Sequence, residues 1–222
     1  MTNALPLPID IVSDVVCPWC YIGKRLLELA VAQKPDIAVE LRFRPYFLNP
    51  WVPREGISRE EYLVTKFGSV ARYNANNQRV VDAAAHVGLP YAREKILRQP
   101  NTLDCHRLIF WASQIGMAAA LKQRLMSLYF AEGADLTDRE ILVRAASGCG
   151  LDPDEIRNRL STDVDVARIE QEAASAKEGG IEGVPYFIFG GLIAVSGAQS
   201  PEYLAQTIER SAEELARRVA AE

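Results

Sequence analysis

Two cysteines separated by two residues, in the stretch Cys17-Pro18-Trp19-Cys20, are the residues best suited to chemistry. Residues 9–16 are apolar and rich in β-branched side chains, which predicts a buried strand, and the apolar spacing after Cys20 predicts a helix. Cys17 is therefore expected at the helix N-terminus, where unpaired N–H groups and the helix dipole favour a thiolate. Cys17 is predicted to be the attacking nucleophile, and Cys20, one turn later, to resolve the mixed disulfide.

A zinc site is one alternative that a cysteine pair raises. Structural zinc takes about four ligands, usually two such pairs or one pair with histidines. Cys105 and Cys149 stand alone, and the only histidines are His86 and His106, so there is no second pair. Another alternative is that the paired cysteines are inert core residues, because buried free cysteines are common. Cys105 and Cys149 are themselves interpreted as small core residues, and a redox role for them is left open.

The composition is that of an ordinary globular protein, since 49% of the 222 residues are hydrophobic and 24% are charged. The net charge of −4 and the lack of a long basic run argue against nucleic-acid binding. No apolar stretch has the length of a membrane span, and residues 1–8 lack the features of a signal peptide. A cytoplasmic location without nucleic-acid or membrane partners is therefore expected.

The two ends of the chain predict α/β structure. Near the N-terminus the predicted elements are a strand, a helix and a strand, over residues 9–16, 19–33 and 37–47. Near the C-terminus they are a helix, a hairpin turning at Gly190-Gly191, and an amphipathic helix, over residues 163–178, 184–189, 192–195 and from 200 onward. A parallel pair and an antiparallel hairpin can share one mixed sheet.

The middle of the chain, from Asn49 to about residue 160, shows helix signals and no convincing strand. Ser58 and Thr137 are each followed three residues later by glutamate, which predicts a capping box at both positions. Asp152 before a proline predicts another helix start. This middle block is therefore expected to be helical and to interrupt the α/β unit.

Further short motifs occur in order along nearly the whole chain. They are Ser13-Asp14 before Cys17-Pro18-Trp19-Cys20-Tyr21-Ile22-Gly23-Lys24, then Phe47-Leu48-Asn49-Pro50, Asn101-Thr102, His106-Arg107-Leu108, Gly183-Val184-Pro185 and Ser196-Gly197-Ala198-Gln199. The ordered set resembles the FrnE-like branch of the DsbA oxidoreductases. That resemblance implies a thioredoxin fold with a helical domain inserted between the second and third core strands. The thioredoxin-like domain would comprise residues 1–52 and 161–222, and the inserted domain residues 53–160.

The resemblance also implies which residues surround the dithiol. It assigns Val184-Pro185 to a cis-proline loop beside Cys17, so Pro185 joins the two cysteines in the predicted catalytic set. A cis X-Pro bond exposes the backbone of the preceding residue, which could pair with an extended peptide or with glutathione. The remaining predicted substrate contacts are Pro18, Trp19, Val184, Asn49 and His106. A turn role for Asn49 and a structural role for His106 stay open.

Two positions depart from the pattern of thioredoxins and DsbA. Those proteins bury a carboxylate six residues before the first cysteine, where this chain has Ile11. Asp14 is the nearest acid, so proton transfer at Cys20 is expected to use Asp14 or water, and a strand-end turn is the other interpretation of Asp14. Trp19 replaces the histidine of DsbA and supplies no positive charge. A reduction potential near those of glutaredoxins, roughly −200 to −230 mV, is therefore expected.

The sequence thus predicts a thiol–disulfide oxidoreductase that needs no metal or nucleotide cofactor. Its expected partners are disulfide-containing or thiol substrates, with glutathione as a candidate redox partner, and a homodimer is left open. The alternative is a glutathione-dependent kappa-type transferase or 2-hydroxychromene-2-carboxylate isomerase. Those enzymes usually have serine in place of Cys17 and lack the second cysteine. A non-catalytic binding module is the third possibility, which the intact dithiol disfavours.

Overall fold

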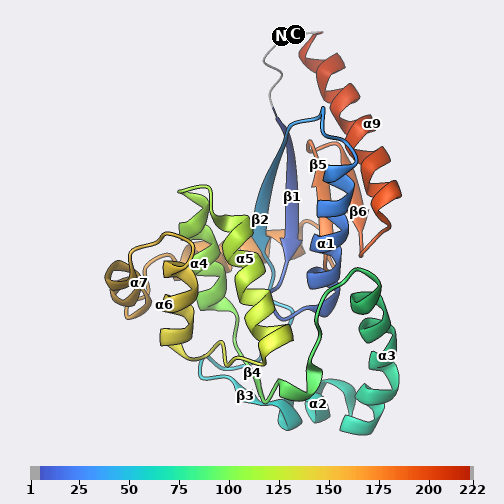
Figure 1. The fold of residues 1–222 in the computed structure, drawn as a ribbon. Helices are drawn as coiled ribbons and strands as arrows, with labels where there is room; N and C mark the ends of the chain where they lie inside the picture. The colour runs from blue at the N-terminus through green and yellow to red at the C-terminus, as the bar shows by residue number, and fades with distance from the viewer. Residues whose placement is uncertain (1–5, 221–222) are drawn as a thin grey trace.

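The core of the fold is a four-stranded sheet in the order β2-β1-β5-β6, seen in a computed structural model that describes residues 6–220 (Figure 1). β1 (Leu7–Ser13) runs parallel to β2 (Val39–Pro45). β1 is antiparallel to β5 (Tyr186–Phe189), which is antiparallel to β6 (Ile193–Ser196). The predicted mixed sheet is confirmed, with strand ends that differ from the expected ones by at most three residues.

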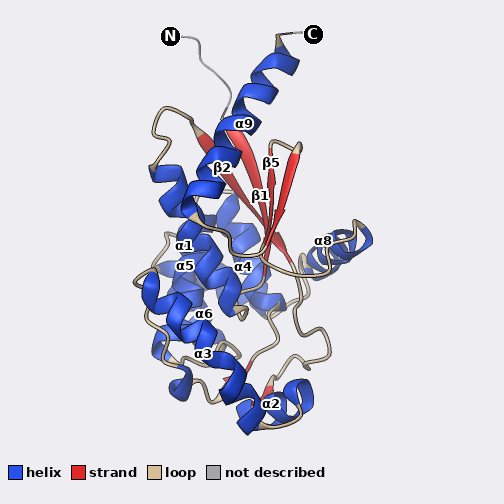
Figure 2. Cartoon of the chain, turned by 90° about the vertical axis from the view of Figure 1, so that its right-hand side faces the viewer, coloured by secondary structure: helices blue, strands red, loops and turns tan. Residues whose placement is uncertain are grey.

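Helices cover both faces of this sheet. α1 (Pro18–Ala32) and α9 (Pro201–Val219) pack together on one face, and α8 (Val166–Glu178) lies on the other, with the sheet between them (Figure 2). The face toward α1 and α9 is apolar because alternate residues of a strand point to the same side. Its buried side chains include Leu7, Ile9, Ile11, Phe187 and Phe189, which share one core with Leu204 and Ile208 of α9. The opposite face carries charged residues, among them Asp10 and Arg44.

A largely helical segment connects β2 to α8 and gathers where β1 and β2 end (Figure 1). Its helices are α2 (Arg59–Phe67), α3 (Val70–His86), α4 (Leu103–Ser113), α5 (Ala118–Ser127), α6 (Arg139–Ser147) and α7 (Pro153–Leu160), with a π-helical turn at Leu128–Glu132 and a 3₁₀ turn at Arg93–Lys95. The expectation that this segment holds no strand is wrong in one detail. Two-residue strands, β3 (Ile57–Ser58) and β4 (Arg98–Gln99), pair antiparallel there. The domain limits at residues 52 and 161 stay a prediction.

Two of the three predicted helix starts are confirmed. The Ser58 hydroxyl accepts a hydrogen bond from Glu61 N, and the Asp152 carboxylate accepts one from Glu155 N. The capping box at Thr137 is wrong, because Asp138 is the N-cap and accepts from Glu140 N. None of the helices within residues 6–220 is both long and apolar enough to cross a membrane.

Gly23 allows α1 to approach the loop before β5. A Cβ atom at position 23 would lie 2.8 Å from Pro185 Cγ, closer than real Cβ contacts. A glycine inside a helix costs roughly 0.5–1 kcal/mol relative to alanine. The glycine therefore permits the close packing that brings Pro185 next to the first turns of α1.

Candidate active site

Cys17 lies at the N-terminus of α1, as the sequence predicts. It is the N-cap residue, and Pro18 is the first residue of the helix. The backbone N–H groups of Cys20 and Tyr21 donate to Cys17 O, at 3.0 and 3.1 Å, and close the first turn. The side chains of Cys17 and Cys20 are free thiols and are 4% and 1% exposed. The two thiols therefore lie within one helical turn in an almost dry environment.

The pKa values of the two thiols shift in opposite directions. The pKa of Cys17 lies below its ordinary value mainly because the Cys20 thiol donates to the Cys17 sulfur, and N–H groups of Cys20 and Trp19 add to this. Burial and the nearby Asp14 carboxylate oppose that shift. Burial raises the pKa of Cys20 well above its ordinary value, and the adjacent Cys17 sulfur raises it further. Cys17 therefore loses its proton at lower pH than Cys20 does, and Cys17 is the nucleophile of the pair.

The loop before β5 brings a backbone carbonyl against the nucleophile. The Val184–Pro185 peptide bond is cis, as expected. The Cys17 thiol donates to Val184 O at 3.6 Å. Trp19 is 37% exposed at the surface next to the dithiol, while Pro18 is half-buried. The predicted catalytic set, Cys17, Cys20 and Pro185, is thus brought together at the end of β1.

Asp14 and His106 lie on the buried side of the dithiol. Asp14 Oδ1 and His106 Nε2 are 3.5 Å apart, and the two side chains are 1% and 3% exposed. Asp14 Oδ2 accepts a hydrogen bond from Leu48 N at 2.8 Å. His106 therefore does not lie on the surface that a substrate would meet, because the register of α4 turns it inward toward β1. The other interpretation of Asp14, as a strand-end turn residue, also fits the structure, because Asp14 directly follows β1 and its carbonyl accepts a hydrogen bond from Cys17 N at 3.3 Å.

Asp14 is held in its charged form. Burial alone would raise its pKa, but the adjacent His106 imidazole, the hydrogen bond from Leu48 N and the Lys122 ammonium lower the pKa below its ordinary value. Burial lowers the pKa of His106, against the opposing effect of Asp14. A carboxylate and a neutral imidazole therefore face each other at neutral pH.

Lys122 on α5 is a buried cation that the sequence interpretation missed. It is 1% exposed, and its Nζ donates to Ser13 O at 3.3 Å. Burial lowers its pKa, whereas the negative charges of Cys20, Asp14 and Cys17 act to raise it. A signal was present in the sequence, because Lys122 lies on the same helical face as the buried residues Ala118, Leu125 and Met126.

Asn49 and Lys66 form a hydrogen-bonded pair near Asp14 and Cys17. Asn49 is 6% exposed, its Oδ1 accepts from Lys66 Nζ at 2.6 Å, and its Nδ2 has no partner among the described residues. Lys66 Nζ lies 5.6 Å from the centre of the Tyr62 ring. Partial burial lowers the pKa of Lys66, and the charges of Cys17 and Asp14 oppose that shift. Lys66 is thus within electrostatic range of the nucleophile, and no sequence motif had singled it out.

Cys105 and Cys149 are part of the interior, at 0% and 8% exposure. Burial raises the pKa of both thiols, so neither is activated. Across the described part of the chain, no group of three or more His, Cys, Asp or Glu side chains is placed to hold a metal ion. The expected role of these two cysteines as core residues is confirmed.

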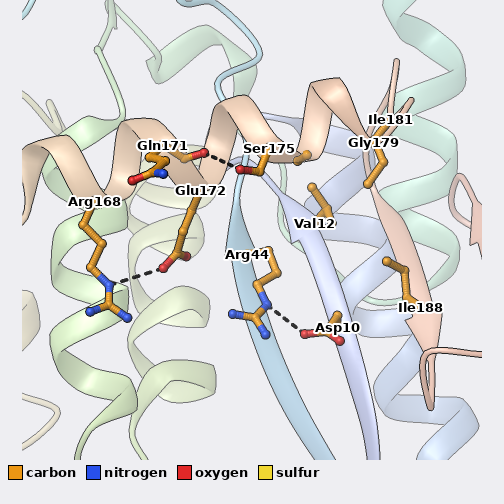
Figure 3. A pocket seen from close by; sticks show the side chains of 11 residues that line it. Asp10, Val12, Arg44, Arg168, Gln171, Glu172, Ser175, Gly179, Ile181 and Ile188 are labelled. Atoms are coloured by element: carbon orange, nitrogen blue, oxygen red, sulfur yellow. Dashed lines mark hydrogen bonds and ion pairs between the residues drawn. The ribbon is translucent and has the colours of Figure 1, made fainter.

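A hollow of about 690 Å³ lies between α8 and the charged face of the sheet (Figure 3). Its charged residues pair with one another: Arg44 Nε donates to Asp10 Oδ1 at 2.8 Å, and Arg168 Nε donates to Glu172 Oε1 at 3.3 Å. None of its lining residues belongs to the set around Cys17. This hollow therefore offers no free charge to a ligand and is separate from the dithiol.

Comparison with known proteins agrees with this geometry. Residues 8–209 match the family model of the DSBA-like thioredoxin domain. The protein YwbO of Bacillus subtilis (strain 168) is 24% identical over 202 residues, which cover 90% of this chain and 94% of that protein.

Solved structures show the same fold. The probable DsbA oxidoreductase SCO1869 from Streptomyces coelicolor is 31% identical with a TM-score of 0.84, over 92% of this chain and 89% of that one. The cytosolic disulfide reductase DsbM from Pseudomonas aeruginosa is 18% identical with a TM-score of 0.63, over 97% of this chain and all (100%) of that one. The thioredoxin fold is thus confirmed, and the chain belongs to the DsbA-like family of thiol–disulfide oxidoreductases.

Proposed function

We propose that this protein exchanges disulfides through Cys17 and Cys20. The observation that carries the proposal is the position of the Cys17 sulfur, at the N-terminus of α1 and 3.6 Å from Val184 O. The Cys17 thiolate attacks a substrate disulfide, forms a mixed disulfide and releases one thiolate. Cys20 then loses its proton and attacks the Cys17 sulfur, which releases the second thiolate. Two electrons pass from the dithiol to the substrate, and substrate oxidation follows the reverse path.

Glutathione is the thiol that we propose reduces the Cys17–Cys20 disulfide. Lys66 meets no carboxylate among the described residues, and the buried Asn49 Nδ2 has no acceptor. A carboxylate of glutathione would accept hydrogen bonds from both groups beside the nucleophile. DsbM, a cytosolic disulfide reductase of the same fold, has been solved with GSH. A cytoplasmic location, with glutathione as electron donor, is part of this proposal.

The kappa-type transferase and 2-hydroxychromene-2-carboxylate isomerase remain the alternative. An isomerase of the latter type shares the fold, with 16% identity and a TM-score of 0.66. Disulfide exchange is favoured because two thiols with oppositely shifted pKa values occupy one helical turn. A glutathione transferase or isomerase has no need for a second thiol that resolves a disulfide.

The function is tested with the Cys20→Ala variant and glutathione disulfide. We expect a stable mixed disulfide between Cys17 and glutathione, detected by mass spectrometry, because the variant lacks the thiol one helical turn away that would resolve it. Wild-type protein should instead form the Cys17–Cys20 disulfide and catalyse glutathione-dependent reduction of insulin. A lack of both products would contradict the proposal, and glutathione-dependent isomerisation of a hydroxychromene carboxylate would favour the alternative.

Lys66→Gln should weaken the reaction with glutathione disulfide selectively. We expect the second-order rate constant to fall roughly fivefold, which corresponds to the loss of about 1 kcal/mol from one charge-assisted contact. The rate with uncharged hydroxyethyl disulfide should stay within about twofold. Lys95→Gln, an exposed lysine in the same helical segment, is the matched control. Equal slowing with both disulfides would show that Lys66 acts on Cys17 and does not bind a carboxylate.

A further inference from the structure

Two buried polar atoms face each other behind the dithiol, and neither has a hydrogen-bond partner among residues 6–220. They are Asp14 Oδ1 and His106 Nε2, 3.5 Å apart. An unsatisfied buried polar atom costs about 1–3 kcal/mol, so two of them facing each other call for an explanation. Together they form a site that can bind one proton, which would give a His106 imidazolium beside the Asp14 carboxylate.

The surroundings hold both side chains in this arrangement. Leu48 N donates to the other carboxylate oxygen of Asp14 at 2.8 Å. The Phe47 ring packs edge-on against the His106 ring, with centroids 5.6 Å apart. The segment that follows β2 therefore fixes the pair from one side, while α4 carries His106 from the other.

The pair is linked to Cys20 through a single peptide group. The backbone N–H of Asp14 acts to lower the pKa of Cys20 and so favours its thiolate. The carbonyl of that same peptide group, Ser13 O, accepts from Lys122 Nζ at 3.3 Å. Cys20, Lys122 and the Asp14–His106 pair thus surround the residues immediately after β1.

The charged and titratable groups around the pair come from four elements. Cys17 and Cys20 belong to the start of α1, Lys122 to α5, Cys105 to α4 and Lys66 to α2. Lys122 is the buried cation of this set and favours negative charge on Cys20. Cys105 keeps its proton because burial raises its pKa.

His106 also reaches a hollow that opens at the edge of the sheet. This hollow, of about 590 Å³, is lined by His106, by β2 and by parts of α4 and α5. Arg168 and Glu172 of α8, which pair with each other, also line it. In the sheet, β2 and β5 flank β1 on opposite sides. Val184, which contacts the Cys17 sulfur, precedes β5. The hollow at β2 therefore lies on the other side of β1 from the loop that would bind substrate.

We propose that Asp14 and His106 relay the proton of Cys20 to solvent through the hollow at the β2 edge. This relay rests on the proposed function of the dithiol. When Cys20 attacks the Cys17 sulfur, its S–H bond breaks and the bond between Cys17 and substrate breaks as the Cys17–Cys20 bond forms. The substrate leaves as a thiolate, and the proton passes to the Asp14–His106 pair and then to water. Substrate bound over Cys17 would not block this exit.

The test separates the two thiol steps with dithiobis(nitrobenzoate), which releases a coloured thiolate in each step. Reduced wild-type protein should give a first phase from attack by Cys17 and a second phase from resolution by Cys20. Cys20→Ala identifies the first phase because it lacks the second. In His106→Gln and Asp14→Asn we expect the second phase to slow by about 10²-fold, as for loss of a positioned acid–base group, with the first phase within about threefold.

The pH profile provides a readout that a purely structural role would not change. Burial lowers the pKa of His106 below its ordinary value of 6.5. The rate of the wild-type second phase should therefore fall only at pH values below 6.5, where the Asp14–His106 pair is already protonated and cannot accept the proton of Cys20. His106→Gln should lose this acid limb. His86→Gln, on the exposed histidine at the end of α3, should keep both phases and the limb.

Chemical rescue tests the route itself. His106→Ala leaves a space continuous with the hollow, so added imidazole should restore the second phase. An unchanged second phase and pH profile in the folded Gln and Asn variants would overturn the relay, as would equal slowing of both phases. A wild-type protein that releases no coloured thiolate would instead contradict the proposed function.

Discussion

Replacing Cys17 with serine is expected to reduce disulfide exchange to the uncatalysed rate. A serine hydroxyl neither ionises near neutral pH nor forms a disulfide, and no other described thiol is activated. Cys105→Ala and Cys149→Ala should retain most of the activity, because burial keeps both thiols protonated and they lie in the core. Insulin reduction with glutathione as reductant measures all three variants.

The controls for this prediction concern folding. Removing a buried sulfur leaves a small cavity, so each alanine variant should lose on the order of 1 kcal/mol of unfolding free energy. Urea unfolding of each variant distinguishes that loss from a loss of chemistry. A large fall in exchange by a folded Cys105→Ala or Cys149→Ala protein would show that a further thiol takes part.

Lys122→Met is expected to make the protein less oxidising. Lys122 is 1% exposed and favours the charged form of Cys20, and the negative charge of Cys17 in turn acts to raise the lysine's pKa. Without this cation the reduced, thiolate form is less stable relative to the disulfide. One unit of rise in the thiolate pKa corresponds to about 1.4 kcal/mol, or about 30 mV for a two-electron couple. We therefore expect a potential more negative by about 30 mV for each such unit.

Equilibration in glutathione buffers measures this shift. Arg124→Met removes a positive charge from the exposed face of the same helix, where Arg124 pairs with Glu132, and should leave the potential unchanged. An unchanged potential in Lys122→Met would show that the cation does not act on the dithiol.

The burial of Lys122 also destabilises the folded state. Its pKa is lowered by burial, so stability should rise as pH increases through the window between the folded value and 10.5.

The expected glutaredoxin-like potential rested on two premises that the structure changes. Trp19 indeed carries no charge, but Lys122 supplies a cation from α5. Ile11 indeed replaces the usual acid, but Asp14 is buried beside the dithiol and interacts electrostatically with Cys17. The two charges act on the thiolate in opposite directions. The value of roughly −200 to −230 mV stays a prediction, and its physical basis is now the balance between Asp14 and Lys122.

Local sequence was sufficient to predict Cys17 at a helix start, because that feature depends only on a strand followed by a helix. The cis bond before Pro185 followed from family resemblance alone. Lys122 and Ser13 are 109 residues apart in the sequence. Helical periodicity can predict that a lysine is buried, but it cannot predict which residue that lysine contacts. The family resemblance placed His106 in the cleft, whereas its side chain is buried beside Asp14. The sequence could not predict this, because it does not give the rotation of α4 about its axis. β3 and β4 were missed because two residues carry no periodic signal.

The packing of α1 against α9 has a consequence for the protein during synthesis. A 15-residue helix is marginal in water by itself, and α9, its packing partner, leaves the ribosome long after α1. Val184, 167 residues after Cys17, is also made late. Until these segments dock, Cys17 is an ordinary cysteine of an unfolded chain, with a thiol pKa near 8.5. The nucleophile therefore becomes activated only after Val184 and α9 have been made and have docked against α1.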